Sequence, residues 1–338
     1  MPKTTVLTDR EATLIARIMR GLPSSPGAGL RIGAGDDAAV LGHARGREWV
    51  ISSDAFLEDV HFLARAHAPA VVGYKALARA TSDLAAMGAM PRFFLLNLAL
   101  PPERTGRWLE ECLRGMAKAA RRFGMKLAGG DTARNRLVSL NMTVLGEIAP
   151  GRAVLRSGAR PGDRLFVTGK LGAAQLGLEI VLRGISGQAC WRKLLAPQCY
   201  PVPPVALGRW LASRRLASSM MDLSDGLSTD LTRLCQASGV GARIWAARLP
   251  TVEAPRALWR SGLRFPHPLH LALHGGEDYQ LLFTVPEQLA DRIPDRRHGV
   301  KITKVGEIVR GHGIELCTPD GKSTRVTPQG WDHFSLRK

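Results

Sequence analysis

The chain has 338 residues, of which 45% are hydrophobic and 22% charged, a balance typical of a globular protein long enough for two domains. Lysine and arginine exceed aspartate and glutamate by 18 (47 − 29), which favours anionic partners. The basic residues are scattered and few aromatic residues lie among them, so no nucleic-acid partner is expected. The N-terminal stretch has no apolar run of secretory or membrane-spanning length, so no membrane partner is expected.

The cysteines show neither a metal-site nor a disulfide pattern. No two are separated by the two residues of a CxxC motif, and the histidines have no zinc-site spacing with them. We therefore expect reduced thiols and a cytoplasmic protein. The five cysteines are Cys112, Cys190, Cys199, Cys235 and Cys317.

The N-terminal part predicts short elements beside acidic residues. A helix capped at Thr8 is expected first. Glycines then surround the adjacent acids Asp36 and Asp37. Glu48–Ser53 predicts a short strand that ends at Asp54.

The stretch Val71–Met90 predicts a helix that is apolar on nearly every side and therefore packed on several faces. Asp83 lies within it among leucine, alanine and methionine residues. An ionised carboxylate in such surroundings needs a partner. Two explanations are open: an ion pair with Arg79 one turn earlier, or a cation held in a polar cleft.

Strands and helices alternate through the rest of the chain, and a boundary is expected at Ala149–Gly151. The pattern predicts an α/β (α+β) protein with two domains, residues 1–150 and 151–338. The predicted strands are Arg92–Leu100, Ser139–Ile148, Arg164–Val167, Ser219–Leu223, Tyr279–Val285 and Ile302–Val309, and the predicted helices are Thr105–Phe123, Leu171–Leu182 and one beginning at Leu227.

The two halves share a faint internal duplication. A Ser-Asp pair precedes a Gly-Gly-acid triplet in each half. The interval from Asp83 to Asp131 is 48 residues (131 − 83), and that from Asp225 to Glu277 is 52 (277 − 225). The similarity suggests two related α/β units.

Acidic residues recur beside glycines or at strand ends. Each alone could be a turn residue or a helix cap, but together they predict oxygen ligands for hard divalent cations, and Mg²⁺ typically also binds substrate phosphates. These acids are Asp36, Asp37, Asp54, Asp83, Asp131, Asp222 and Asp225.

The standard phosphate-binding motifs are missing from the sequence. Gly169-Lys170 lacks both the upstream glycine and the following hydroxyl residue of a Walker A loop. Gly33 and Gly35 are followed by two acids rather than by a dinucleotide fingerprint. Phosphates would then be held by glycine-rich turns and metal ions.

Several segments, in the same order along the chain, resemble the thiamine-monophosphate kinase family. That family belongs to the superfamily of aminoimidazole-ribonucleotide synthetase, selenophosphate synthetase and the hydrogenase-maturation dehydratase. The segments are GAGDDAAV at Gly33, SSDAFLEDVHF at Ser52, SDLAAMGAMP at Ser82, GGDT at Gly129, DLSDGLSTDL at Asp222, GGEDYQL at Gly275 and the terminal GWDHF at Gly330.

The resemblance implies an enzyme that phosphorylates thiamine monophosphate with ATP to give thiamine diphosphate, the last step in making that compound. It implies direct in-line transfer assisted by several Mg²⁺ ions, without a protein acid or base. It also implies a homodimer formed through the N-terminal sheet, with a C-terminal domain that completes the nucleotide and substrate site.

The resemblance also implies roles for individual residues. The metal ligands would be Asp37, Ser52, Ser53, Asp54, Asp83, Asp131, Asp222 and Asp225. The ATP contacts would be Gly130, Arg156 and Ser224, and the thiamine phosphate contacts would be His61, Glu277 and Trp331. From the residues alone, the alternative interpretations are a core histidine for His61 and a C-terminal packing residue for Trp331, and a role in the site is favoured for both.

Two positions depart from the family pattern. Ser53 stands where threonine is common, and Asp59 stands where a glycine is expected before His61. Selenophosphate synthesis or hydrogenase maturation would show a functional cysteine near one terminus, but the chain ends in FSLRK and its first cysteine is Cys112. Aminoimidazole-ribonucleotide synthetase resembles the chain less at the paired Asp36-Asp37. A basic nucleic-acid-binding protein is the alternative outside enzymes, and salt-sensitive nucleic-acid binding would support it.

Overall fold

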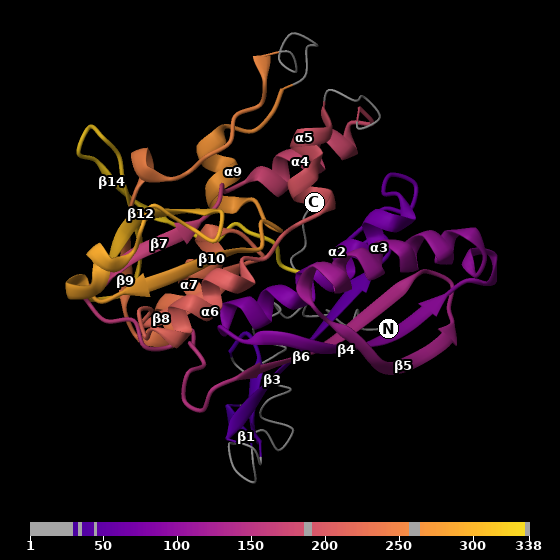
Figure 1. Cartoon of the computed structure of the whole chain (residues 1–338). Helices are drawn as coiled ribbons and strands as arrows, with labels where there is room; N and C mark the ends of the chain where they lie inside the picture. Colours follow the sequence, from indigo (N-terminus) through magenta and orange to yellow (C-terminus); the bar gives the residue numbers. More distant parts are fainter. Residues whose placement is uncertain (1–29, 33–35, 44–45, 186–190, 257–263, 335–338) are drawn as a thin grey trace, which may run out of the picture.

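The computed structural model describes residues 30–32, 36–43, 46–185, 191–256 and 264–334. The helix predicted at Thr8 and the glycines Gly33 and Gly35 lie outside these residues. Two sheets with helices packed on them account for most of the described chain, so the predicted α/β class is confirmed (Figure 1).

The N-terminal sheet has the strand order β1-β2-β3-β6-β4-β5. β4 and β5 run parallel, and the other neighbours run antiparallel. Its strands are β1 (Leu30–Ile32), β2 (Ala39–His43), β3 (Arg47–Leu57), β4 (Met90–Leu100), β5 (Lys126–Arg134) and β6 (Ser139–Ile148).

Two helices, α2 (Pro69–Ala86) and α3 (Arg107–Phe123), lie on one face of this sheet (Figure 1). α2 is buried along most of its length, as its apolar sequence predicts. It ends at Ala86 rather than at Met90, because Gly88 adopts a φ of 75° and its amide donates to the carbonyl of Ala85.

The C-terminal sheet has the order β14-β13-β9-β12-β7-β10-β8, with β11 paired to β12. Its strands are β7 (Arg164–Thr168), β8 (Ser219–Leu223), β9 (Gly241–Trp245), β10 (Gln280–Val285), β11 (Arg296–Arg297), β12 (Val300–Val309), β13 (Gly313–Cys317) and β14 (Ser323–Val326). The helices of this half are α4 (Ala173–Leu182), α5 (Arg192–Cys199), α6 (Val205–Ser213), α7 (Leu227–Ser238) and α9 (Pro268–His274).

Residues 149–163 connect the two sheets, so the predicted boundary at residue 150 lies in a linker. The division into domains at residues 1–150 and 151–338 stays a prediction. One hydrophobic core continues across the junction, from Leu77 of α2 to Phe166 and Phe283 of the second sheet. Within the described part of the chain, none of the helices combines the length and apolarity needed to cross a bilayer.

The packing of α2 against α3 depends on glycine. A Cβ atom added at Gly73 would lie 1.9 Å from the carbonyl oxygen of Cys112, and one added at Gly115 would lie 1.8 Å from that of Ala70. The two backbones therefore approach more closely than a side chain at either position allows.

We expect Gly73→Ala to lower the free energy of unfolding by about 1–3 kcal/mol, because the new methyl group forces the two helices apart. Thermal or urea unfolding measures the change. Arg114→Ala, on the exposed side of α3, is the control and should leave stability nearly unchanged. Equal stability of the Gly73 variant would mean that the close approach is not required.

Candidate active site

A cavity of about 420 Å³ opens where the two halves meet. Its walls come from the loop between β3 and α2, from α2 itself, from the loops after β8 and before β10, and from the C-terminal segment. Many predicted site residues line it: Asp54, His61, Asp83, Asp222, Ser224, Asp225, Glu277 and Trp331.

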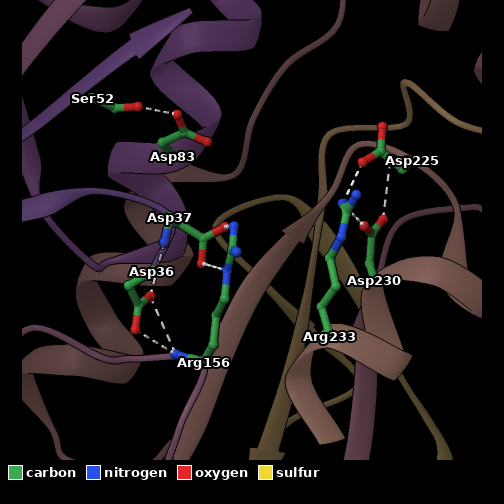
Figure 2. Close-up of polar contacts among 8 residues, drawn as sticks. All are labelled: Asp36, Asp37, Ser52, Asp83, Arg156, Asp225, Asp230 and Arg233. Carbon is green, nitrogen blue, oxygen red and sulfur yellow. Dashed lines mark hydrogen bonds and ion pairs between the residues drawn. The ribbon is translucent and has the colours of Figure 1, made fainter. Parts of the chain in front are cut away.

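Three carboxylates from separate elements meet beside this cavity. Asp37 precedes β2, Asp83 lies in α2 and Asp222 lies in β8, and one oxygen of each is within 4.8 Å of the others. Ser52 of β3 donates its hydroxyl hydrogen bond to Asp83 (Figure 2). An ion pair between Asp83 and Arg79, one of the two explanations left open by the sequence, is not formed, because Arg79 Nε donates to Asp54 Oδ2 at 3.2 Å instead.

The electrostatics of this acid cluster favour a cation. Burial, followed by repulsion from Asp54, Asp222 and Asp37, raises the pKa of Asp83 well above its usual value. Burial and then Asp37 raise the pKa of Asp222 to about 7. A divalent cation bound by these oxygens would remove the repulsion, so the donor set fits Mg²⁺.

Arg156 is the partner of the two adjacent acids. Its Nε and Nη2 donate to the two carboxylate oxygens of Asp37 at 3.0 and 2.8 Å, and its main-chain N–H donates to Asp36 Oδ2 at 3.1 Å (Figure 2). Burial and then the charge of Asp37 raise the pKa of Asp36 to about 6. The predicted ATP contact at Arg156 is thus joined to a predicted metal ligand.

Asp225 lies at the other side of the acid cluster, at the start of α7. It forms an ion pair with Arg233, which also reaches Asp230 at 3.2 Å (Figure 2). The main-chain carbonyl of Asp225 accepts a hydrogen bond from the amide of Trp331 at 3.2 Å. This contact holds the C-terminal segment against the cavity, although Trp331 is far from Asp225 in sequence.

The end of the cavity away from the acids contains Glu277. Its Oε2 accepts hydrogen bonds from Lys75 Nζ at 2.8 Å and from Gln198 Nε2 at 3.0 Å. Lys75 is 1% exposed, and its ammonium also donates to Gln198 Oε1 at 2.9 Å. Although burial opposes it, the charge and hydrogen bond of Lys75 lower the pKa of Glu277, so a carboxylate is kept at this end.

His61 lies in the loop between β3 and α2. Its Nδ1 accepts a hydrogen bond from the amide of Leu57 at 3.0 Å, so Nε2 carries the proton. Burial, and then the charge of Arg79, lower the pKa of His61 to about 3, and the neutral ring packs against Phe56 and His333.

The same loop explains one departure from the family pattern. Asp59 has a φ of 64°, a conformation that glycine adopts freely and aspartate tolerates better than most residues. The glycine expected here from the resemblance would adopt the same conformation without strain.

Ser53, Gly130 and Asp131 are not brought to the cavity. Asp54 is aligned with Gly130 across β6 and β4, so about 14 Å separates the two positions at the usual strand spacing. Gly130 has a φ of 152°, and a Cβ there would lie 1.9 Å from the carbonyl oxygen of Leu96, so glycine lets β5 pair closely with β4. By strand alternation, Ser53 and Asp131 point to the face opposite α2.

Sequence reasoning missed Lys75, Arg79 and Gln198 as parts of the site. A signal was available for two of them, because Lys75, Arg79 and Asp83 recur every four residues in an otherwise apolar helix and so share one face. Gln198 carried no such signal.

Both halves of the chain match known proteins. Residues 35–148 match the family model described as AIR synthase related protein, N-terminal domain, and residues 160–317 match the C-terminal domain of the same family. The thiamine-monophosphate kinases of Escherichia coli (strain K12) and Salmonella typhimurium are 39% and 37% identical to this chain, and each match covers 96% of this chain and 98% of the relative.

A solved structure described as "AaThiL complexed with AMPPCP and TMP" superposes with a TM-score of 0.83. It is 30% identical in sequence, and the match covers 96% of this chain and 97% of the other.

The acid cluster predicts a pH-dependent stability. The unfolded chain releases the Asp222 proton near pH 3.8, whereas the folded chain keeps it up to about pH 7. The folded state therefore binds more protons between about pH 4 and 7, and the free energy of unfolding of the metal-free protein falls as pH rises through this window. Asp222→Asn should flatten that slope and raise the melting temperature of the metal-free protein at pH 7.5.

Melting curves with and without Mg²⁺ test this expectation. Mg²⁺ should stabilise the wild-type protein more than the Asp222→Asn variant. Asp320→Asn changes an exposed carboxylate far along the chain and should behave like the wild type. An unchanged pH slope in the Asp222 variant would show that its proton does not contribute.

Proposed function

The chain belongs to the thiamine-monophosphate kinase family, and on that premise we propose that it transfers the γ-phosphoryl group of ATP to thiamine monophosphate, giving thiamine diphosphate and ADP. The observation that supports this most strongly is one cavity lined both by acids of the cluster and by Glu277, His61 and Trp331. A kinase acting on a cationic heterocycle that carries a phosphate needs both sets of residues.

The residues suited to hold Mg²⁺ are the buried and half-buried oxygen donors around α2, namely Asp37, Ser52, Asp54, Asp83 and Asp222, with Asp225 beside them. Bound Mg²⁺ neutralises phosphate charge and stabilises the charge that develops on a transferring phosphoryl group. Several ions are expected, because the negative charge of these carboxylates exceeds the two positive charges of one Mg²⁺.

Transfer is proposed to be direct and in line. A phosphate oxygen of thiamine monophosphate attacks the γ-phosphorus of ATP, the bond from that phosphorus to the bridging oxygen breaks, and ADP leaves. The second pKa of a phosphomonoester is about 6, so the nucleophile is ionised at neutral pH and needs no base. His61 fits this scheme, because it stays neutral and its Nε2 can only donate.

The end of the cavity at Glu277 suits the thiamine ring system. The carboxylate of Glu277 keeps one oxygen, Oε1, for an amino group of the substrate, while Lys75 and Gln198 hold Oε2. Trp331 offers an aromatic face to a cationic ring. Trp331 as a whole residue is 39% exposed.

We propose a homodimer because some predicted site residues lie on the face of the N-terminal sheet opposite α2, away from the cavity. The face of the N-terminal sheet opposite α2 carries exposed Ser53, Phe93, Asn97 and Asp131, with no described helix packed on it. A second copy on this face would cover these side chains. Asp131 and Gly130 would then serve the partner's site rather than their own.

The first test of this proposal is product formation. Incubation with ATP, Mg²⁺ and thiamine monophosphate should yield thiamine diphosphate by chromatography, and thiamine should not be phosphorylated, because its hydroxyl requires a base. Asp83→Asn should lower turnover by on the order of 10²–10³, the usual cost of losing one electrostatic element. Asp320→Asn should keep full activity.

Radiolabelled ATP should leave no stable label on the protein, and initial rates should show both substrates bound before product leaves. Ping-pong kinetics or a kinetically competent phosphoenzyme would contradict direct transfer, and absence of thiamine diphosphate would contradict the function.

Mixing two inactive variants tests the dimer. Asp83→Asn and Asp131→Asn should each be nearly inactive, but their mixed dimer has one site with both substitutions and one site with neither. Random exchange of subunits should restore about a quarter of wild-type activity, since half of the dimers are mixed and each keeps one intact site. No recovery despite exchanged subunits would place Asp131 in its own chain's site or outside any site.

A further inference from the structure

Arg79 supplies the permanent positive charge in the described wall of the cavity. The lining residues include five carboxylates and several histidines but no other arginine and no lysine among the described positions. The five carboxylates belong to Asp54, Asp83, Asp222, Asp225 and Glu277.

The position of Arg79 is fixed by α2. Lys75, Arg79 and Asp83 follow one another at four-residue steps on one face of the helix, about 6 Å apart at 1.5 Å per residue. Lys75 contacts Glu277 at one end of the cavity, and Asp83 belongs to the acid cluster at the other. Arg79 therefore lies midway between the two ends.

The guanidinium of Arg79 is held in place, but one of its N–H donor groups has no acceptor. Nε donates to Asp54 Oδ2 at 3.2 Å, and the group lies 5.4 Å from the centre of the Phe56 ring. The side chain is 13% exposed. Nη1 is buried and has no hydrogen-bond partner. A buried N–H without a partner is costly, so a missing acceptor at this place is indicated.

We propose that Arg79 binds the phosphate group of thiamine monophosphate and so distinguishes the phosphorylated substrate from thiamine. The inference rests on the proposed function, and it assigns a substrate-binding role to a residue that neither the sequence motifs nor the resemblance placed in the site. In thiamine monophosphate a two-carbon arm joins the phosphate to the thiazolium ring. A ring bound near Glu277 and Trp331 therefore places its phosphate between them and the acid cluster, where Arg79 lies.

Charge supports the same assignment. A phosphate dianion that enters a cavity lined by five carboxyl groups is repelled unless cations meet it, and the proposed Mg²⁺ ions lie at the acid cluster rather than midway along α2. Lys75 does not meet this need, because its ammonium is buried and bonded to Glu277 and Gln198. Arginine presents several N–H donors in one plane and binds phosphate oxygens in pairs.

A different role for Arg79 would be to neutralise Asp54. In that case the guanidinium would control how tightly Asp54 binds a metal ion, and it would have no preference between ligands with and without phosphate. The two roles differ in what they predict for thiamine itself, which lacks the phosphate.

Calorimetric titrations of thiamine monophosphate and of thiamine, in Mg²⁺ without nucleotide, separate these roles. Arg79→Ala should weaken thiamine monophosphate binding by on the order of tenfold to a hundredfold, the worth of a charge-assisted hydrogen bond. It should leave thiamine binding unchanged, which also shows that the variant is folded. Arg79→Lys should recover part of the loss. Arg164→Ala removes an ion pair with Glu307 in the C-terminal sheet, outside the cavity, and should match the wild type.

Undiminished binding of thiamine monophosphate by Arg79→Ala, or equal weakening of both ligands, would overturn the inference while leaving the proposed kinase function intact. A changed Mg²⁺ affinity with an unchanged preference for the phosphorylated ligand would likewise overturn it, in favour of the Asp54 role. A wild-type protein that binds neither ligand would contradict the proposed function, and the inference with it.

Discussion

Mutual repulsion among buried carboxylates is the constraint on which the rest of this structure depends. Asp37, Asp83 and Asp222 come from three elements that are far apart in sequence, and packing brings their oxygens within 4.8 Å. Each carboxylate alone would be costly to bury, and together they also repel. The fold tolerates them because Arg156 pairs with Asp37, and because burial and mutual repulsion raise the pKa of Asp83 and of Asp222, which favours their protonated forms when no cation is present.

Helix α2 connects the acid cluster to the packing of both sheets. Its apolar sides join the core of the N-terminal sheet to residues of β8 and β10 in the second sheet, and its one polar face forms the cavity wall. Gly208 of α6 meets it where an added Cβ would lie 2.1 Å from the carbonyl oxygen of Ala85. Because one helix serves both the core and the site, the two cannot shift relative to each other without loss of packing.

Periodicity and composition predicted most elements and the apolar burial of α2, since these depend on neighbours along the chain. They could not predict which side chains would pair with each other, because the order of the strands and helices in space decides those pairs. Lys75 and Glu277 are 202 residues apart, and Arg79 pairs with an aspartate of β3 rather than with Asp83 one turn away. The sequence also grouped Asp131 with the other acids, whereas strand order puts it on a separate face. The internal duplication stays a prediction, because Asp83 lies within a helix whereas Asp225 precedes one.

The substrate end of the cavity depends on the acid cluster through the backbone. Glu277 and Tyr279 have φ values of 67° and 48°, conformations that cost non-glycine residues on the order of 1–3 kcal/mol each. Their amides donate to the carbonyls of Ser224 and Leu223 at 2.7 and 2.9 Å, and these residues directly follow Asp222. The strained loop that aims Glu277 is thus held by the chain segment that carries an acid of the cluster. A cation bound by Asp222 would therefore lie next to the segment that holds this loop, so the backbone links the proposed metal and substrate ends of the cavity.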